Sequence, residues 1–271
     1  MIKRIFQNIM IFFNKIIEDD IYALASQLAY NLILAFFPFL IFLMTLIGFS
    51  NLNSEAVLEL LKHIMPLAAY QLIESTVISV ISTQQTGLLW VSIVLAIYTS
   101  SSGFSAVIRG LNKAYGIEED RSFIKVKLIS IVSVLMLAVI IIATLFLFVF
   151  SNTITSVIVK YIPNPEIILD VWAIAKNIVL IFVMVFGFVI MYQMIPSRRL
   201  GWLNVIPGAA FTTVGWIAAS AAFGYYVNNF GNYSRFYGGL GAVFIFMTWM
   251  FLTSFILILG GEVNAVLVDK E

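Results

Sequence analysis

Glu262 is the residue of this sequence whose type and setting most clearly suggest chemistry. It stands in the apolar run FILILGGEVNAVL, residues 255–267, where hydrocarbon is expected on both sides. A charged side chain at the centre of a bilayer costs about 2.5–3.5 kcal/mol or more, so a partner or a use for the carboxylate is expected. Two interpretations are open: a functional acid inside a helix bundle, or a polar clamp that holds packed helices together.

Seven further polar side chains are expected to share a cytoplasm-facing cavity with this carboxylate. With a rise of about 1.5 Å per residue, Asn31, Ser101 and Glu262 each lie roughly 10–12 Å inside their apolar segments. We expect Arg109 to be the charge partner of Glu262, and Gln27, Asn31 and Ser105 to be its hydrogen-bond partners. The seven residues predicted to line the cavity with Glu262 are Gln27, Tyr30, Asn31, Ser101, Ser105, Arg109 and Asn264.

Motifs for enzymatic chemistry are scarce in the chain. His63 is the only histidine and cysteine is absent, so a zinc site or a nucleophile–histidine pair would rest on a single residue. No glycine is followed by lysine, which excludes a phosphate-binding loop of the Walker type. We therefore expect no catalytic residue, no metal site and no cofactor.

The elements that must position these residues follow from composition. Of 271 residues, 62% are apolar and only 11% are charged, with a mean hydropathy of +1.04. Several segments run for about 20 residues without a charge, the length that crosses a hydrocarbon core as a helix. The predicted fold is an all-α polytopic membrane protein with six spans and additional amphipathic interfacial helices. The spans are predicted at Leu24–Phe49, Gly87–Ile108, Val126–Phe150, Ile178–Ile195, Val205–Val227 and Gly238–Val268.

Basic residues indicate the orientation of these spans. Eleven of the fifteen lysines and arginines fall on the side that holds both termini, and four on the other. By the positive-inside rule, both termini are expected in the cytoplasm. We treat residues 1–271 as one membrane domain, in which 1–18 form a cytoplasmic amphipathic helix and 51–86 and 151–175 form structured outer loops.

Three runs carry a resemblance to a known family: DDIYALASQLAYNLILAFFPFLIFL, SSSGFSAVIRGLNKAYGIEEDRSF and RFYGGLGAVFIFMTWMFLTSFILILGGEVNA. In content, order and spacing they resemble the YihY / virulence-factor BrkB family over nearly the whole chain. The resemblance implies a six-helix protein of the bacterial inner membrane with cytoplasmic termini. It does not imply a settled activity, since members carry ribonuclease, virulence or serum-resistance labels and lipid export has been proposed for one branch. Positions that match the family pattern include Asp20, Gly103, Asn112, Tyr115, Gly241, Gly260, Glu262 and Asn264.

The function expected from the residues is transport or export of a lipid or other amphiphile through the polar cavity. Its head group would sit at Arg109 and Glu262 while its chains stay in lipid. The alternative is a membrane scaffold that maintains the envelope without transport, and a ribonuclease is less favoured because the cytoplasmic loops are short and their carboxylates do not converge. We expect membrane lipids as partners, allow for a homo-oligomer, and expect no nucleic acid.

Overall fold

Six long helices make up most of the part of the chain that the structure describes. This part, in the computed structural model, comprises Phe12 and residues 14–49, 58–59, 62, 70, 74, 78, 89–161, 166–230 and 240–268. Each helix is long and apolar enough to cross a membrane, and the described residues contain no strand. These observations confirm the all-α polytopic fold with six spans. The helices are α2 (Ile21–Phe49), α5 (Leu89–Ala114), α6 (Phe123–Tyr161), α7 (Glu166–Met194), α8 (Ile206–Phe230) and α10 (Leu240–Val268).

The observed helix ends differ most from the predicted span ends at two places. The second helix, α5, continues past Ile108 to Ala114, because Arg109 and Lys113 are tolerated at its end and do not terminate it. The segment 151–175 consists largely of the end of α6 and the beginning of α7. The predicted amphipathic helix at 1–18 and the outer loop at 51–86 lie for the most part outside the described residues.

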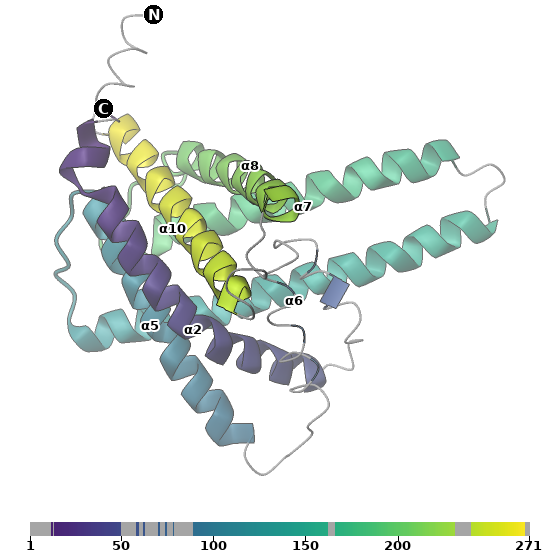
Figure 1. The fold of residues 1–271 in the computed structure, drawn as a ribbon, viewed down its shortest axis with the longest axis horizontal. Helices are drawn as coiled ribbons and strands as arrows, with labels where there is room; N and C mark the ends of the chain where they lie inside the picture. Colours follow the sequence, from purple (N-terminus) through teal and green to yellow (C-terminus); the bar gives the residue numbers. More distant parts are fainter. Residues whose placement is uncertain are drawn as a thin grey trace, which may run out of the picture.

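The helices contact one another mainly in chain order. Each helix contacts the next one along the chain, and α10 also contacts both α2 and α5. The start of α2 and the end of α10 lie at the same end of the bundle (Figure 1). We call this end, where α5 and α7 also finish and α6 and α8 begin, the termini end.

Among the helix pairs, α2 and α5 have the most extensive contact. Gly103 of α5 permits it, because a Cβ atom at this position would lie only 2.8 Å from the Cβ of Ala35 on α2. Nearby, the buried Ser100 hydroxyl donates a hydrogen bond to the Ala35 carbonyl at 3.4 Å. Small residues therefore bring the two backbones together, the usual solution where lipid supplies no hydrophobic drive between helices.

The α6–α7 pair is built differently. It extends away from the α2–α5–α10 group (Figure 1), and its two helices contact each other less extensively than α2 and α5 do. Far from the termini end they are joined by the Trp172 indole, which donates to the Thr155 hydroxyl at 3.1 Å. The other connection lies at the termini end, where Arg121 donates to the Ile195 carbonyl.

The Gly103→Ala substitution is expected to lower the thermal unfolding temperature in detergent. The added Cβ meets a rigid atom of the neighbouring helix, and overpacking of this kind costs about 1–3 kcal/mol. Gly224→Ala is the matched control, since a Cβ at Gly224 of α8 meets no atom within 4 Å. Equal unfolding temperatures for the two variants would show that the α2–α5 contact is not tight at Gly103.

Candidate functional site

A buried hydrogen-bonded cluster joins three helices at the termini end. The Tyr192 hydroxyl of α7, fully buried, donates to the Leu257 carbonyl of α10 at 2.7 Å and lies 2.6 Å from the Thr212 hydroxyl of α8. Because a tyrosine hydroxyl has one hydrogen, Thr212 is the donor in its contact with Tyr192. Polar groups at membrane depth are costly without partners, and here each hydroxyl has one.

Two glycines allow α8 and α10 to touch beside this cluster. A Cβ on Gly260 would collide with the Thr212 and Tyr192 hydroxyl oxygens, and a Cβ on Gly208 would collide with the Gly260 carbonyl and the Asn264 amide. The Gly208 amide uses the space to donate to the Asn264 side-chain oxygen at 2.7 Å. Backbone and side chains thus meet at distances that only glycine permits.

Asn264 extends the cluster to α5. Its amide nitrogen donates to the Tyr115 hydroxyl at 3.4 Å, and that hydroxyl donates to the Tyr192 carbonyl at 3.3 Å. Burial raises the pKa of the Tyr115 phenol, which lies just beyond the α5 span; the hydrogen bond from Asn264 opposes the rise and the charge of Glu262 adds to it. Tyr115 therefore serves as a neutral hydrogen-bonding group.

Glu262 is fully buried on α10, on the side that faces α5. One turn earlier, the Ile258 side chain would lie 3.5 Å from a Cβ on Gly110, and a Cβ on Gly261, next to Glu262, would lie 3.2 Å from the Leu111 side chain. The carboxylate is thus inside the bundle near Tyr115, as its cost in lipid requires.

The other predicted cavity residues are distributed over two levels and several faces. Asn31 and Ser101 share a level, since Gly103 lies beside the Asn31 carbonyl, whereas Glu262 is level with Leu111, about 15 Å nearer the termini end at 1.5 Å per residue. The common depth expected from the sequence fails because α5 continues to Ala114. Gln27, Tyr30 and Arg109 are exposed, while Ser101 and Asn264 are buried.

Much of the hydrogen bonding of these polar residues stays within their own helices. The Asn31 amide donates to the Gln27 carbonyl at 2.7 Å, and the Ser101 hydroxyl donates to the Tyr98 carbonyl at 2.6 Å. Ser105 donates back to the Ser101 carbonyl and lies 3.0 Å from the Ser130 hydroxyl of α6. The pairing of Arg109 with Glu262 stays a prediction.

A second polar cluster, the loop clamp, ties the α5–α6 loop to the end of α7. It begins where α5 ends: Gly116, with φ of 63°, and the bond from the Ile117 amide to the Asn112 carbonyl at 2.8 Å turn the chain back on itself. This turn brings Glu119 and Arg121 to the end of α7. Their contacts join α5, the loop and α7.

Arg121 is the centre of the loop clamp. It binds Glu119 through two nitrogens at 2.7 and 2.6 Å, and donates to the Ile195 carbonyl at the end of α7 at 3.2 Å. The Asn112 side chain donates to Glu119 at 2.8 Å and accepts from the Ser197 amide at 2.9 Å. Hydrogen bonds from Arg121 hold the pKa of the Glu119 carboxyl below its usual range.

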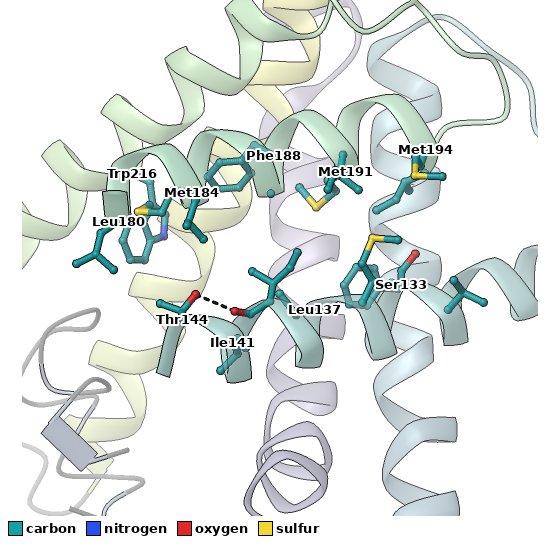
Figure 2. Close-up of a pocket in the computed structure, with 18 of the residues that line it drawn as sticks. Ser133, Leu137, Ile141, Thr144, Leu180, Met184, Phe188, Met191, Met194 and Trp216 are labelled. Carbon is teal, nitrogen blue, oxygen red and sulfur yellow. Dashed lines mark hydrogen bonds between the residues drawn. The ribbon is translucent and has the colours of Figure 1, made fainter. Parts of the chain in front are cut away.

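An apolar groove of about 1600 Å³ lies between α6, α7 and α8. Its walls include Met184, Phe188 and Met191 of α7 and, facing them, α6 with Leu137 and Ile141 (Figure 2). At the termini end, its lining contains the basic residues Arg121, Lys125 and Arg199. The eight residues predicted from the sequence are not among those that line this groove. The groove depends on the distance between α6 and α7, and no local sequence pattern encodes that distance.

These features define a class: a helical membrane protein with a polar core at one end and an apolar groove between three of its helices. Residues 12–271 match the family described as Virulence factor BrkB, and the chain belongs to that family. This confirms the resemblance drawn from the three sequence runs.

Similar proteins occur in several bacteria. The chain is 37% identical over 91% of its length to YfkH of Bacillus subtilis (strain 168), a protein named as ribonuclease-like, of which it covers 90%. It is 29% identical to a UPF0761 membrane protein of Tolumonas auensis, over 31% of the chain and 28% of that protein. A UPF0761 membrane protein of Paraburkholderia xenovorans is 32% identical over 30% of the chain and 19% of its own length. No solved structure matches the chain.

Gly260→Ala is expected to destabilise the protein by about 3 kcal/mol or more, because the new Cβ displaces both hydroxyls of the Tyr192–Thr212 pair. Gly261→Ala provides the control, since its Cβ meets a movable Leu111 methyl at 3.2 Å. Thermal unfolding in detergent measures both. A Gly260→Ala variant as stable as Gly261→Ala would contradict the close approach of α8 and α10.

Acidification is expected to release the loop clamp. Because the folded-state pKa of Glu119 is lowered from 4.5, its contribution to stability is complete above that value and is lost as pH falls through the lowered pKa. Apparent unfolding temperatures recorded from about pH 6 to pH 3 should therefore fall less in Glu119→Gln than in the unsubstituted protein. Glu118→Gln, in the same loop, should retain the full dependence; identical profiles for all three would refute the role of Glu119.

Proposed function

We propose that this protein moves an amphiphile, most simply a membrane lipid, along the groove between α6, α7 and α8. The groove is the observation that supports the proposal most directly. Its volume of about 1600 Å³ exceeds the usual range for small-molecule pockets, roughly 300–1,000 Å³. Its walls are mainly apolar side chains, which suit acyl chains better than a hydrophilic solute.

The length of the groove supports movement between leaflets. Lining residues on α6 run from Lys125 to Thr144, a distance of roughly 28 Å at 1.5 Å per residue. This is close to the thickness of a hydrocarbon core, about 30 Å. An amphiphile in the groove could therefore pass from one head-group region to the other with its chains in contact with protein or lipid throughout.

The proposed orientation places the termini end in the cytoplasm of a bacterial cell and the groove in its inner membrane. The excess of basic residues at this end supports it. An amphiphile would then enter from the inner leaflet, beside Arg121, Lys125 and Arg199. Without a Walker loop in the sequence, movement would be downhill, coupled to an ion or powered by a partner.

Glu262, buried near the hydrogen-bonded cluster, has a supporting role in this proposal. Its carboxylate is the intramembrane group suited to carry a coupling proton, with Arg109 as the proposed charge partner. In the alternative scaffold function, Glu262, Asn264 and Tyr192 would only hold helices together. A ribonuclease function, suggested by the name of YfkH, is a further alternative.

The test of this proposal places larger side chains in the groove and leaves the polar clusters unchanged. Gly187 of α7 and Gly224 of α8 line the groove, and a Cβ at either meets no atom within 4 Å. Gly187→Leu and Gly224→Leu should fold normally and slow lipid movement about tenfold or more, equivalent to about 1.4 kcal/mol in the barrier. The measurement is the rate at which a head-group-labelled lipid becomes accessible to a membrane-impermeant quencher in proteoliposomes.

Ala173→Leu is the matched control, because this exposed α7 position does not line the groove. It should leave the rate unchanged. Equal rates in all three variants and in protein-free vesicles would reject transport and favour the scaffold. RNA cleavage by purified protein, insensitive to the groove variants and without lipid movement, would favour the nuclease.

A further inference from the structure

We propose that the termini end of the groove binds the anionic, phosphate-bearing head group of a membrane lipid through Lys125 and Arg199. This inference rests on the proposed function in taking the groove as the path of an amphiphile, and it adds the charge of the substrate and the residues that select it.

The two cations converge on one mouth of the groove from different elements. Lys125 lies in the first turn of α6, and Arg199 lies in the segment between α7 and α8. Both residues are exposed and both line the groove. Because α6 and α7 are antiparallel, the beginning of one and the end of the other meet at the termini end.

Arg121 lines the same mouth but has a different role. Its guanidinium is held by Glu119 and by the Ile195 carbonyl, and its side chain is only 9% exposed. Within the described part of the chain, the ion pairs engage Arg121 and Lys113 but neither Lys125 nor Arg199. The last two are therefore the cations at this mouth that are available to a ligand, while Arg121 shapes the wall.

Charge and shape together favour a lipid over a soluble anion. Of the three basic residues at the mouth, Arg121 is paired with Glu119, and the described lining contains no carboxylate, so a negatively charged group is attracted to Lys125 and Arg199. Beyond the mouth, the walls are apolar and rich in methionine, which adapts to chains of varied shape (Figure 2). A free anion would use the mouth and leave the rest of the groove without a function, whereas a lipid with an anionic head group occupies both.

The test uses the absence of cysteine in the chain, which allows a fluorophore to be attached at one chosen site. Ser133→Cys places it in the groove, and Leu135→Cys, two residues along α6 and not lining the groove, places it outside. Vesicles contain phosphatidylglycerol and phosphatidylcholine in one fixed ratio, with a nitroxide on the acyl chain of either the first or the second. Only the lipid that carries the quencher differs between samples.

We expect the phosphatidylglycerol-borne nitroxide to quench the Ser133→Cys fluorophore more strongly than the phosphatidylcholine-borne one, and both to quench Leu135→Cys equally. The preference should be roughly fivefold for each cation, equivalent to about 1 kcal/mol. Lys125→Gln and Arg199→Gln should each reduce it by that factor. Arg198→Gln, exposed but not lining the groove, is the matched control and should preserve it.

Equal quenching by the two lipids at Ser133→Cys would overturn the proposal, as would a preference that survives the loss of both cations. Loss of the preference on adding soluble glycerol phosphate at the lipid's concentration would overturn the assignment to a membrane lipid. Raising the salt concentration to about 1 M screens charges and should therefore weaken the preference of the protein without Lys125 or Arg199 substitutions. This test does not depend on how those variants fold. A preference for phosphatidylglycerol without lipid movement would support this site and reject transport. Lipid movement without that preference would support transport and reject this site.

Discussion

The close approach of α8 and α10 at Gly208 and Gly260 is the contact on which the organisation of the termini end depends. Any larger residue at either position would meet a backbone carbonyl or a hydrogen-bonded side chain of the other helix. The gap left by the missing side chains accommodates the Tyr192–Thr212 pair, which fastens α7 to the same place. Polar groups that would be costly in lipid are hydrogen-bonded to one another there, and these bonds favour one arrangement of the helices.

Fixing α7 at one end has consequences for the helix next to it. The α6–α7 pair is joined at the termini end by the loop clamp and at its far end by the Trp172–Thr155 hydrogen bond. Between these two connections, Gly187 of α7 faces open space, in contrast to Gly103, which lies against α2. The groove is the result: two helices tied near their ends and separated in the middle, beside a tightly packed α2–α5–α10 group.

The features that could be predicted from the sequence are those set by the free-energy cost of placing polar or charged groups in hydrocarbon. Spans were predictable because hydrocarbon tolerates only long apolar helices, and the burial of Glu262 was predictable because its charge is costly in lipid. Span ends were less predictable, since Arg109 and Lys113 lie within α5 while the turn at Gly116 ends it. The Tyr192–Thr212 pair had a signal, two polar residues in apolar segments, but its geometry depends on glycines in other helices. The groove depends on helix spacing, which no local pattern encodes.

The 39 residues of α6 give a helix of roughly 58 Å, whereas a bilayer with its head groups measures about 40–45 Å. Even at a tilt of about 40°, the upper end of the usual range, the helix reaches from one aqueous surface to the other with nothing to spare. At smaller tilts its last turns, with Lys160 and Tyr161, stand clear of the head groups together with the first turn of α7. The end of α6 then projects into the aqueous compartment beyond the membrane as an uninterrupted continuation of the transmembrane helix.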